Sequence, residues 1–530
     1  MPISISDKVT TNTLIVFGYN KVYYGGTNVP PTFTELTTTG LEIDTSDQLT
    51  SFEGFQKRFV VNGAKLYVAD FINTKLTHSA LTTAHAHGDI LTQAVTGATM
   101  VVDFTDTAKT HTYGFVTSGT FTATANDITG SGSGTTFQAT AVTAPKHWYA
   151  WTVYSGGASG SMPAKAYLGC LYRGRCVLSG NPNYPFQWYM SRTANPWDWL
   201  YAANDAMSPV AGGNADAGQL GDVIRALIPY KDEYLVMGCA NSMWVLRGDP
   251  ACGGSIESID LTIGIFGEKS WCFDGAGNLY FLSKSGLNMI PANLGGVQPI
   301  SQPVLPNFST AEALDPAIHR VTLAYDPDSY GIVICITTLA TGVNSNYFYD
   351  LRTQGLFPET YPTSCGVYSA FYYNANDDTT RGLLLGGADG YIRCFSKTEK
   401  NDVGTGADSI ITSHCTLPII QNDDDDRELR MTSLTITTAG GESGGTEGDT
   451  DGVTVNVYSA DSAEAVLEAI EDGDTPQSIT TLSGVGRNNR IRDRVRGHSL
   501  AVELKNSTTD QTWAIERVAA DVESVGKVKQ

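Results

Sequence analysis

The fold is indicated most clearly by residues 272–282, which read CFDGAGNLYFL. Two short apolar and aromatic runs flank a turn that extends from Asp274 to Asn278. Glycine and asparagine tolerate the positive φ angles of tight turns, and aromatic and aliphatic side chains suit pleated strands. The stretch therefore predicts a β-hairpin.

The same pattern of two apolar runs around a turn recurs along the chain. It is found at residues 14–24, 59–68, 234–246, 323–334 and 383–395. Hairpins that each bury little surface favour radial repetition, so we predict an all-β fold built on a β-propeller. The spacing between the copies is irregular, and a pair of stacked β-sandwiches would produce similar hairpins, so this alternative stays open.

Composition supports an all-β chain with an acidic surface. The 530 residues include 34 Lys and Arg against 55 Asp and Glu, a net charge of −21, and 41% are hydrophobic. This hydrophobic fraction excludes global disorder, and the length predicts two to four domains. The acidic balance disfavours wrapping of DNA phosphates and docking on anionic membranes, whereas it suits a surface past which DNA slides.

The termini and cysteines suggest a protein made in a reducing cytoplasm. The first residues lack a basic start followed by an apolar core, and no apolar run is long enough to span a bilayer. We therefore expect neither a signal peptide nor a membrane anchor. The nine cysteines, scattered from Cys170 to Cys415, lack zinc-site spacing and are all predicted to be buried thiols.

Four segments are predicted. Residues 1–90 contribute N-terminal hairpins to the propeller, and 91–145 form a small inserted β module, because they are rich in Thr and poor in charge. Residues 146–420 form the main propeller, and 421–530 form a C-terminal β platform with one short helix. The module is expected to protrude, and its deletion is expected to leave the remainder folded.

The C-terminal segment contains the strongest helix signal of the chain. Asp461 is the expected N-cap, with Glu464 three residues later as in a capping box. Val466, Leu467 and Ile470 form the expected apolar stripe, and Gly473 ends the helix.

No residue pattern indicates catalysis or a cofactor. His85 and His87 have no third ligand nearby and are expected to lie in a surface loop before the module. The run Asp423–Asp426 lacks the glycine turn of a calcium loop and is predicted to be a solvated acidic loop. Asp274, Asp326 and Asp350 are candidate carboxylates for sugar cleavage, without support from their spacing.

The candidate interface is a basic cluster formed by Arg487, Arg490, Arg492, Arg494 and Arg496. The last four recur with period two, so they would share one face of a strand, opposite Ile491, Asp493 and Val495. Such a face could grip phosphate, an acidic partner or another subunit. It could equally be a surface strand that pairs with acidic residues of its own segment, such as Glu468, Glu471, Asp472 and Asp474.

Aromatic residues are densest at 184–189 and 197–201. A platform on which sugar rings stack is one interpretation, and core packing between propeller blades is the other.

The central stretch resembles the propeller of tailed-phage nozzle proteins, also called head-closure or packaged-DNA-stabilisation proteins. The resemblance is carried by RGRCVLS at 173–179, NPWDW at 195–199, GDVIRALIP at 221–229, SMWVLRGDP at 242–250 and the hairpin at 272–287. In the C-terminal segment it is carried by the helix at 462–472, the strand Arg487–Arg496 and WAIER at 513–517. It covers roughly residues 165–400 and 425–525.

The resemblance implies a structural virion protein without enzymatic activity or cofactor. Such proteins form a ring, usually sixfold, in the tail, with an adaptor protein above and fibre, spike or needle proteins around it, and double-stranded DNA passes through transiently. We expect carboxylates to outnumber Lys and Arg wherever the ring faces its axis, and the arginines to face a neighbouring subunit. The alternative is a carbohydrate-binding or depolymerising propeller at the tail tip.

Overall fold

The computed structural model shows an all-β chain. It describes residues 2–6, 9–25, 32–124, 126–132, 134–154, 160–201, 205–212, 220–363, 365–375, 377–396, 399–404, 407–422, 427–440, 450–482, 486–492 and 494–527. The chain divides into two compact units, Met1–Pro358 with Val367–Cys394, and Glu359–Gly366 with Phe395–Gln530. The predicted boundary at 420/421 is therefore too late, because β38 (Ser413–Thr416) pairs with β45 (Ser499–Asn506) of the second unit.

The first unit contains seven antiparallel sheets of three or four strands among its described residues. The first two sheets are β3 (Leu14–Gly18), β4 (Lys21–Gly25) and β5 (Phe33–Glu35), then β6 (Thr50–Gly54), β7 (Lys57–Asn62), β8 (Lys65–Asp70) and β16 (His147–Ala150). The third and fourth are β17 (Leu168–Tyr172), β18 (Arg175–Asn181), β19 (Tyr184–Met190) and β20 (Val210–Ala211), then β21 (Ile224–Tyr230), β22 (Tyr234–Cys239), β23 (Met243–Arg247) and β24 (Ser255–Asp260). The fifth and sixth are β25 (Trp271–Phe273), β26 (Leu279–Ser283), β27 (Gly286–Ile290) and β28 (Gln298–Pro299), then β29 (His319–Asp326), β30 (Gly331–Thr338), β31 (Asn344–Asp350) and β32 (Leu356–Glu359). The seventh is β33 (Val367–Tyr373), β34 (Gly382–Gly387) and β35 (Ile392–Cys394).

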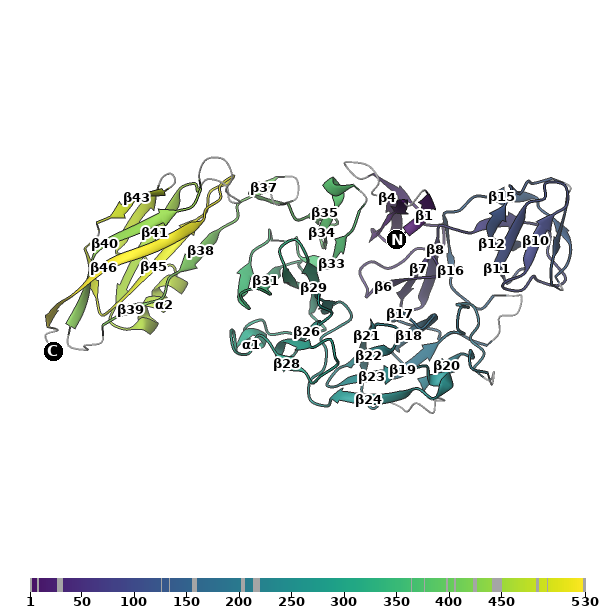
Figure 1. Cartoon of the computed structure of the whole chain (residues 1–530), viewed down its shortest axis with the longest axis horizontal. Coiled ribbons are helices and arrows are strands. Elements are labelled where there is room, and N and C mark those ends of the chain that lie inside the picture. Colours follow the sequence, from purple (N-terminus) through teal and green to yellow (C-terminus); the bar gives the residue numbers. More distant parts are fainter. Residues whose placement is uncertain are drawn as a thin grey trace. The chain divides into compact units, whose positions relative to one another are not determined.

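These sheets form a closed ring, which is a β-propeller. The first strands of neighbouring sheets contact each other, as β6 does with β17 and β29 with β33, so they surround the common centre (Figure 1). The N-terminal sheet closes the ring, because Leu14 of β3 packs on Tyr373 of β33 while Val22 of β4 packs on Val60 of β7. All six hairpins predicted from the sequence pair as expected.

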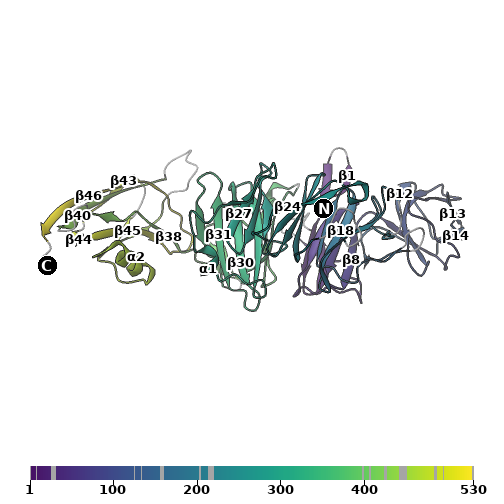
Figure 2. The ribbon, with the colours of Figure 1, turned by 90° about the horizontal axis from the view of Figure 1, so that it is seen from below.

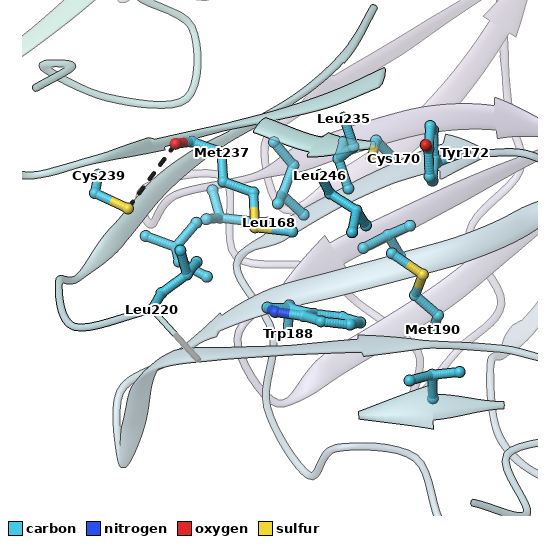
Figure 3. Close-up of a cluster of buried hydrophobic side chains, with 14 residues drawn as sticks. Leu168, Cys170, Tyr172, Trp188, Met190, Leu220, Leu235, Met237, Cys239 and Leu246 are labelled. Atoms are coloured by element: carbon cyan, nitrogen blue, oxygen red, sulfur yellow. Dashed lines mark hydrogen bonds between the residues drawn. The ribbon is translucent and has the colours of Figure 1, made fainter. Parts of the chain in front are cut away.

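Apolar clusters between adjacent sheets hold the propeller together. Leu168 of β17 and Met190 of β19 pack against Leu235 and Met237 of β22, and Trp188 is wholly buried (Figure 3). Burial of each such large side chain contributes roughly 1.5–3 kcal/mol to the stability of the fold. The alternation of side chains along the strands places apolar residues at each interface between sheets.

A seven-stranded sheet interrupts the second blade between β8 and β16. Its strands are β9 (Thr74–Thr77), β10 (Ile90–Gln93), β11 (Thr99–Thr105), β12 (His111–Ser118), β13 (Asp127–Gly130), β14 (Phe137–Gln138) and β15 (Ala141–Thr143). The module predicted at 91–145 thus begins earlier, because β9 pairs with both β12 and β15. Phe104 of β11 also lies in a propeller core cluster with Tyr149 and Trp197, so the sheet is packed on the blade and does not merely protrude from it.

The second unit is a β-sandwich. One sheet contains β38, β39 (Ile420–Gln421), β41 (Val453–Ala460), β42 (Ser478–Leu482) and β45, and the other contains β40 (Arg427–Thr438), β43 (Gly486–Ile491), β44 (Val495–Gly497) and β46 (Ile515–Lys527). Met431 and Ile436 of β40 pack against Val455 and Val502 in the core between the sheets. The alternative of two stacked β-sandwiches does not describe the repeated hairpins, since all six belong to the propeller sheets of the first unit.

Short elements complete the chain. They are the hairpins β1 (Pro2–Ser6) with β2 (Val9–Asn12) and β36 (Asp402–Val403) with β37 (Asp408–Ser409), the helices α1 (Phe308–Ala311) and α2 (Ala463–Glu471), and the 3-10 turns η2 (Pro250–Cys252) and η3 (Asp378–Thr380). In the part of the chain that the structure describes, no helix is long and apolar enough to cross a membrane.

The prediction that all cysteines are buried is wrong at three positions. All nine are free thiols, but Cys252, Cys394 and Cys415 are exposed. Cys252 lies in a 3-10 turn, and the other two lie on the outermost strands β35 and β38, where alternate side chains face solvent.

Candidate interaction surface

The arginine cluster lies on one edge of the sandwich sheet that contains β40. Ile491 of β43 is opposite Leu434 of β40, and Val495 of β44 is opposite Met431. The arginine-bearing segment therefore advances by four residues where β40 advances by three, so it contains one extra residue. The extra residue interrupts the strand that the sequence predicted as continuous. We call residues 487–496 the arginine strand.

The predicted alternation is confirmed where side chains are described. Ile491 and Val495 are buried, whereas Arg492, Arg494 and Arg496 are exposed. The side chains of Arg487 and Arg490, together with Asp493, lie outside the described residues, although Arg487 and Arg490 belong to β43.

The arginine strand is poorly neutralised within its own chain. Among the described side chains its one ion pair joins Arg496 Nη2 to Glu428 Oε2 at 3.2 Å, and both groups are more than a third exposed. Such exposed pairs contribute little to stability. Arg496 is also directly opposite Arg430 of β40, and like charges at this spacing repel each other.

Helix α2 carries the opposite charge. Its N-cap is Ser462, whose Oγ accepts a hydrogen bond from the Ala465 N–H at 3.1 Å, so the predicted cap at Asp461 is wrong by one residue. Val466 is buried against Tyr458 and Ala501, but Leu467 is exposed, so the predicted apolar stripe is wrong at Leu467. The helix contacts the sheet through the side formed by Val466, Ala469 and Ile470, which points Leu467 towards solvent.

Six exposed carboxylates lie on this helix and its two ends. They belong to Asp461, Glu464, Glu468, Glu471, Asp472 and Asp474. Within the described residues none of the six makes an ion pair, and no lysine or arginine lies between 461 and 474. We call residues 461–474 the acidic helix.

The arginine strand and the acidic helix lie on opposite faces of the sandwich. Val457 and Val502 point into the core between the sheets, so their neighbours Tyr458 and Ala501 point outward, and α2 covers that outer face. Figure 2 shows α2 on one side of the sandwich and β40, β43 and β46 on the other. Among the described side chains, the arginines therefore make no pair with Glu468, Glu471, Asp472 or Asp474, although Arg496 does pair with another acidic residue of its own segment, Glu428.

The two histidines considered as metal ligands are structural. His85 lies in the loop between β9 and β10 but is fully buried there, and its Nε2 lies 3.1 Å from the carbonyl oxygen of Thr135. His87 Nδ1 lies 2.7 Å from the carbonyl oxygen of Asp103. No group of three or more His, Cys, Asp or Glu side chains suited to a metal occurs in the described ranges. The acidic run Asp423–Asp426 lies outside those ranges.

The three candidate carboxylates cap their own turns. Asp274 accepts hydrogen bonds from the N–H groups of Ala276 and Asn278. Asp326 accepts one from the Asp328 N–H, and Asp350 accepts one from the Arg352 N–H. These hydrogen bonds hold the pKa of Asp350 below its usual range, the reverse of what a general acid requires. The geometry thus gives no support to sugar cleavage at these residues.

The aromatic runs are mostly core. Trp188, Trp197 and Trp199 are wholly buried, whereas Tyr184 and Phe186 of β19 are about half exposed. Stacking of a sugar on the tryptophans is therefore excluded in this conformation.

Sequence reasoning missed a buried polar cluster at the junction of the seven-stranded sheet and the propeller. Asp103 of β11 accepts hydrogen bonds from Trp197 Nε1 at 2.9 Å and from Asn73 Nδ2 at 2.7 Å, and it pairs with Lys57. Tyr149 donates to Asp70 at 2.6 Å beside it. Because these residues are far apart in the chain, no sequence spacing signals the cluster.

Comparisons with known proteins add only a distant likeness. No protein-family model matches this chain, and no curated protein sequence matches it. The extracellular domain of the putative one component system BT4673 from B. thetaiotaomicron is 12% identical; the match covers 89% of this chain and 62% of that chain, less than two thirds, with a TM-score of 0.30. A glycoside hydrolase is 10% identical; the match covers 64% of this chain and 94% of that chain, with a TM-score of 0.23. The extracellular domain of the putative hybrid two component system BT3049 from B. thetaiotaomicron is 10% identical; the match covers 96% of this chain and 82% of that chain, with a TM-score of 0.19. At these TM-scores the likenesses support no conclusion about activity.

Proposed function

We propose that this chain is a structural virion protein that assembles head to tail into the nozzle ring of a phage tail. The ring would retain DNA, let it pass, and offer attachment surfaces to the adaptor and to fibre, spike or needle proteins. The proposal is supported by the sequence resemblance described above and, for assembly, by one structural observation. The arginine strand and the acidic helix lie on opposite faces of one sandwich and are scarcely neutralised there.

A head-to-tail contact would resolve this separation of charge. In a cyclic assembly, one patch of each subunit meets a different patch of the next, so opposite faces are the places where complementary patches belong. Arg492 and Arg494 of one copy would meet Glu464 and Glu468 of the next. Guanidinium groups bind carboxylates through paired hydrogen bonds, which adds geometric specificity to the attraction.

The propeller would supply rigidity. Closed rings of small sheets leave only short edges, and the apolar clusters between sheets resist distortion. The protein would be made in the host cytoplasm, where its free thiols stay reduced, and would then join the tail.

Charge reversal tests the assembly. One variant carries Arg492→Glu, Arg494→Glu and Arg496→Glu, and a second carries Glu464→Lys, Glu468→Lys and Glu471→Lys. Each alone should remain monomeric by native mass spectrometry and light scattering. An equimolar mixture should form rings with an even number of subunits, because alternating copies restore attraction at every contact. The wild-type chain, with adaptor protein added if needed, should form the homo-oligomer.

The matched control is Lys284→Glu with Arg352→Glu, two exposed cations of the propeller, and it should assemble as the wild type does. A wild-type chain that stays monomeric with its adaptor present would contradict the ring. Rings that form equally well from either reversed variant alone would show that the arginine strand and the acidic helix are not the contact.

A further inference from the structure

Three cations gather at one end of the propeller centre. Arg225 is the second residue of β21, Arg320 is the second residue of β29, and Lys269 stands two residues before β25. The first strands of propeller blades run in the same direction around the axis, so their beginnings surround the same mouth. All three side chains are half-buried.

Contacts across the blades bring Lys269 and Arg320 together at Tyr368, and Arg225 contacts the segment that precedes Lys269. Lys269 Nζ donates to the carbonyl oxygen of Tyr368 at 3.3 Å, although the blade of β29 stands between their two blades in the ring. The Arg320 guanidinium lies over the Tyr368 ring, 4.4 Å from its centroid. Arg225 Nη1 donates to the carbonyl oxygen of Phe266 at 3.3 Å, close to Lys269 in sequence.

Two β-bulges point to a shaped site. The register of β21 shifts between Ile224 and Ala226, which makes Arg225 the bulged residue. The register of β33 shifts between Val367 and Ser369, which makes Tyr368 the bulged residue. A bulge re-aims a side chain at the cost of local pairing, and here two of them occur at the same end of two first strands.

None of the three cations makes an ion pair within the described residues. No carboxylate among the described residues lies within 4 Å of Arg225, Lys269 or Arg320. The propeller treats other buried cations differently, since Lys57 pairs with Asp103 at 3.0 Å and Arg175 pairs with Asp249 at 3.1 Å. Ionised groups removed from water normally find a partner within the protein, whereas here Arg320 has only the longer-range charge of Asp47, so the mouth keeps an excess of positive charge.

Glu268, whose carboxyl group interacts with Lys269, does not neutralise that amine at pH 7. Its Oε2 is buried and accepts no hydrogen bond. Burial raises the pKa of Glu268 to about 8, so its carboxyl is mainly protonated at pH 7. Burial also lowers the pKa of Lys269 to about 8, which leaves that amine mainly charged at pH 7. A protonated Glu268 is a hydrogen-bond donor, as an anion would require.

We propose that Arg225, Lys269 and Arg320 form a binding site for the oxyanion of a small molecule at the mouth of the propeller. Two guanidinium groups and one ammonium offer the donors that a phosphate or carboxylate group accepts, and the half-buried setting strengthens each contact. Tyr368 holds Arg320 and Lys269 in place through its ring and its backbone carbonyl. The site involves neither the arginine strand nor the acidic helix, so it stands apart from ring assembly.

Titration calorimetry of the full chain at low ionic strength tests the site, with inorganic phosphate and citrate as probes. Wild type should bind at least one probe with saturation near one per chain, and the preferred probe distinguishes phosphate from carboxylate ligands. Arg320→Gln and Lys269→Met should each weaken binding at least tenfold. The control Arg352→Gln, which changes an exposed arginine of a hairpin turn, should leave binding unchanged.

Stability measurements keep the test independent of folding failures. Without a probe, Arg320→Gln should melt no lower than wild type, because it removes an unpaired charge, and phosphate or citrate should raise the melting temperature of wild type but not of the variant. Absence of saturable binding in wild type, or equal binding in both variants, would overturn the proposal. Binding of a short DNA duplex that phosphate displaces and that Arg320→Gln abolishes would also overturn it, since the site would then serve the DNA backbone.

Discussion

Lys57 Nζ in β7 lies 3.0 Å from Oδ2 of Asp103 in β11, and the two side chains are only 5% and 11% exposed. This ion pair joins the seven-stranded sheet to the propeller blade that it interrupts. Around it, Asn73 and Trp197 donate hydrogen bonds to the same carboxylate. The junction is therefore part of the folded core, and its energetics can be tested directly.

Asp103→Asn should destabilise the protein strongly. The amide keeps the shape of the side chain but removes the ion-pair partner of the buried Lys57 ammonium, which retains only the weaker charge interaction with Asp70; breaking a buried pair in this way costs about 3–5 kcal/mol. Chemical denaturation monitored by tryptophan fluorescence measures this loss. Asp127→Asn, an exposed aspartate of the same sheet, should change the free energy of unfolding by less than about 0.5 kcal/mol. Equal effects of the two substitutions would show that the ion pair contributes nothing.

The same pair should make stability depend on acid pH. Burial alone would raise the pKa of Asp103, but the Lys57 charge and the hydrogen bonds from His87 and Trp197 bring it well below its usual range. A carboxyl whose pKa is lower in the folded state stabilises the protein fully above about pH 4 and loses that contribution as the pH falls further. The unfolding free energy of wild type should therefore fall more steeply between pH 5 and pH 3 than that of Asp103→Asn; parallel curves would contradict this assignment.

Deletion of the inserted sheet should succeed only if its boundaries follow the structure. Removing 91–145 leaves β9 without its partners β12 and β15 and leaves Lys57 unpaired, so that chain should aggregate or unfold. Asp70 and His147 face each other across β8 and β16, so a short glycine turn can replace residues 74–144. That deletion combined with Lys57→Met should yield a soluble propeller by circular dichroism and gel filtration. A stable 91–145 deletion would show that the junction is dispensable.

Glu268→Gln should stabilise the protein at alkaline pH. Burial raises the folded-state pKa of this carboxyl to about 8, so its contribution is complete below about pH 4.5 and is lost as the pH rises towards 8. Lys269 and the Leu227 N–H act against this rise, and Cys170 is the other titratable group that interacts with it. The variant should exceed wild type in unfolding free energy by at least about 1 kcal/mol at pH 8, with a smaller difference at pH 5. A difference that does not change with pH would refute the shifted titration.

If the ring forms through the arginine strand and the acidic helix, salt should dissociate it. The screening length falls from about 10 Å at 0.1 M to about 3 Å at 1 M ionic strength, which weakens attraction between exposed charges. Light scattering should show smaller particles as sodium chloride increases. Rings that persist unchanged in 1 M salt would point to apolar contacts elsewhere.

The local structure of this chain follows from its sequence alone. Hairpins such as 272–282 and 323–334 follow from alternating apolar residues around turn-forming ones, and both signals act between near neighbours. The alternation also predicts that Ile491 and Val495 point inward and that Arg492 and Arg494 point outward, and it does so independently of the partner strand. The helix ended at Gly473 as expected, because its positive φ of 71° suits glycine.

Which distant segments meet depends on the packing of the whole chain. The pairing of β9 with β12, the ion pair between Lys57 and Asp103, and the packing of Leu14 on Tyr373 that closes the propeller all join residues that no local pattern relates. The arginine strand and the acidic helix are adjacent in sequence, yet they lie on opposite faces, because α2 packs on the outer face of one sheet while β43 joins the other sheet. Long-range contacts depend on the shape of the whole core, and that shape is set by packing rather than by the order of residues along the chain.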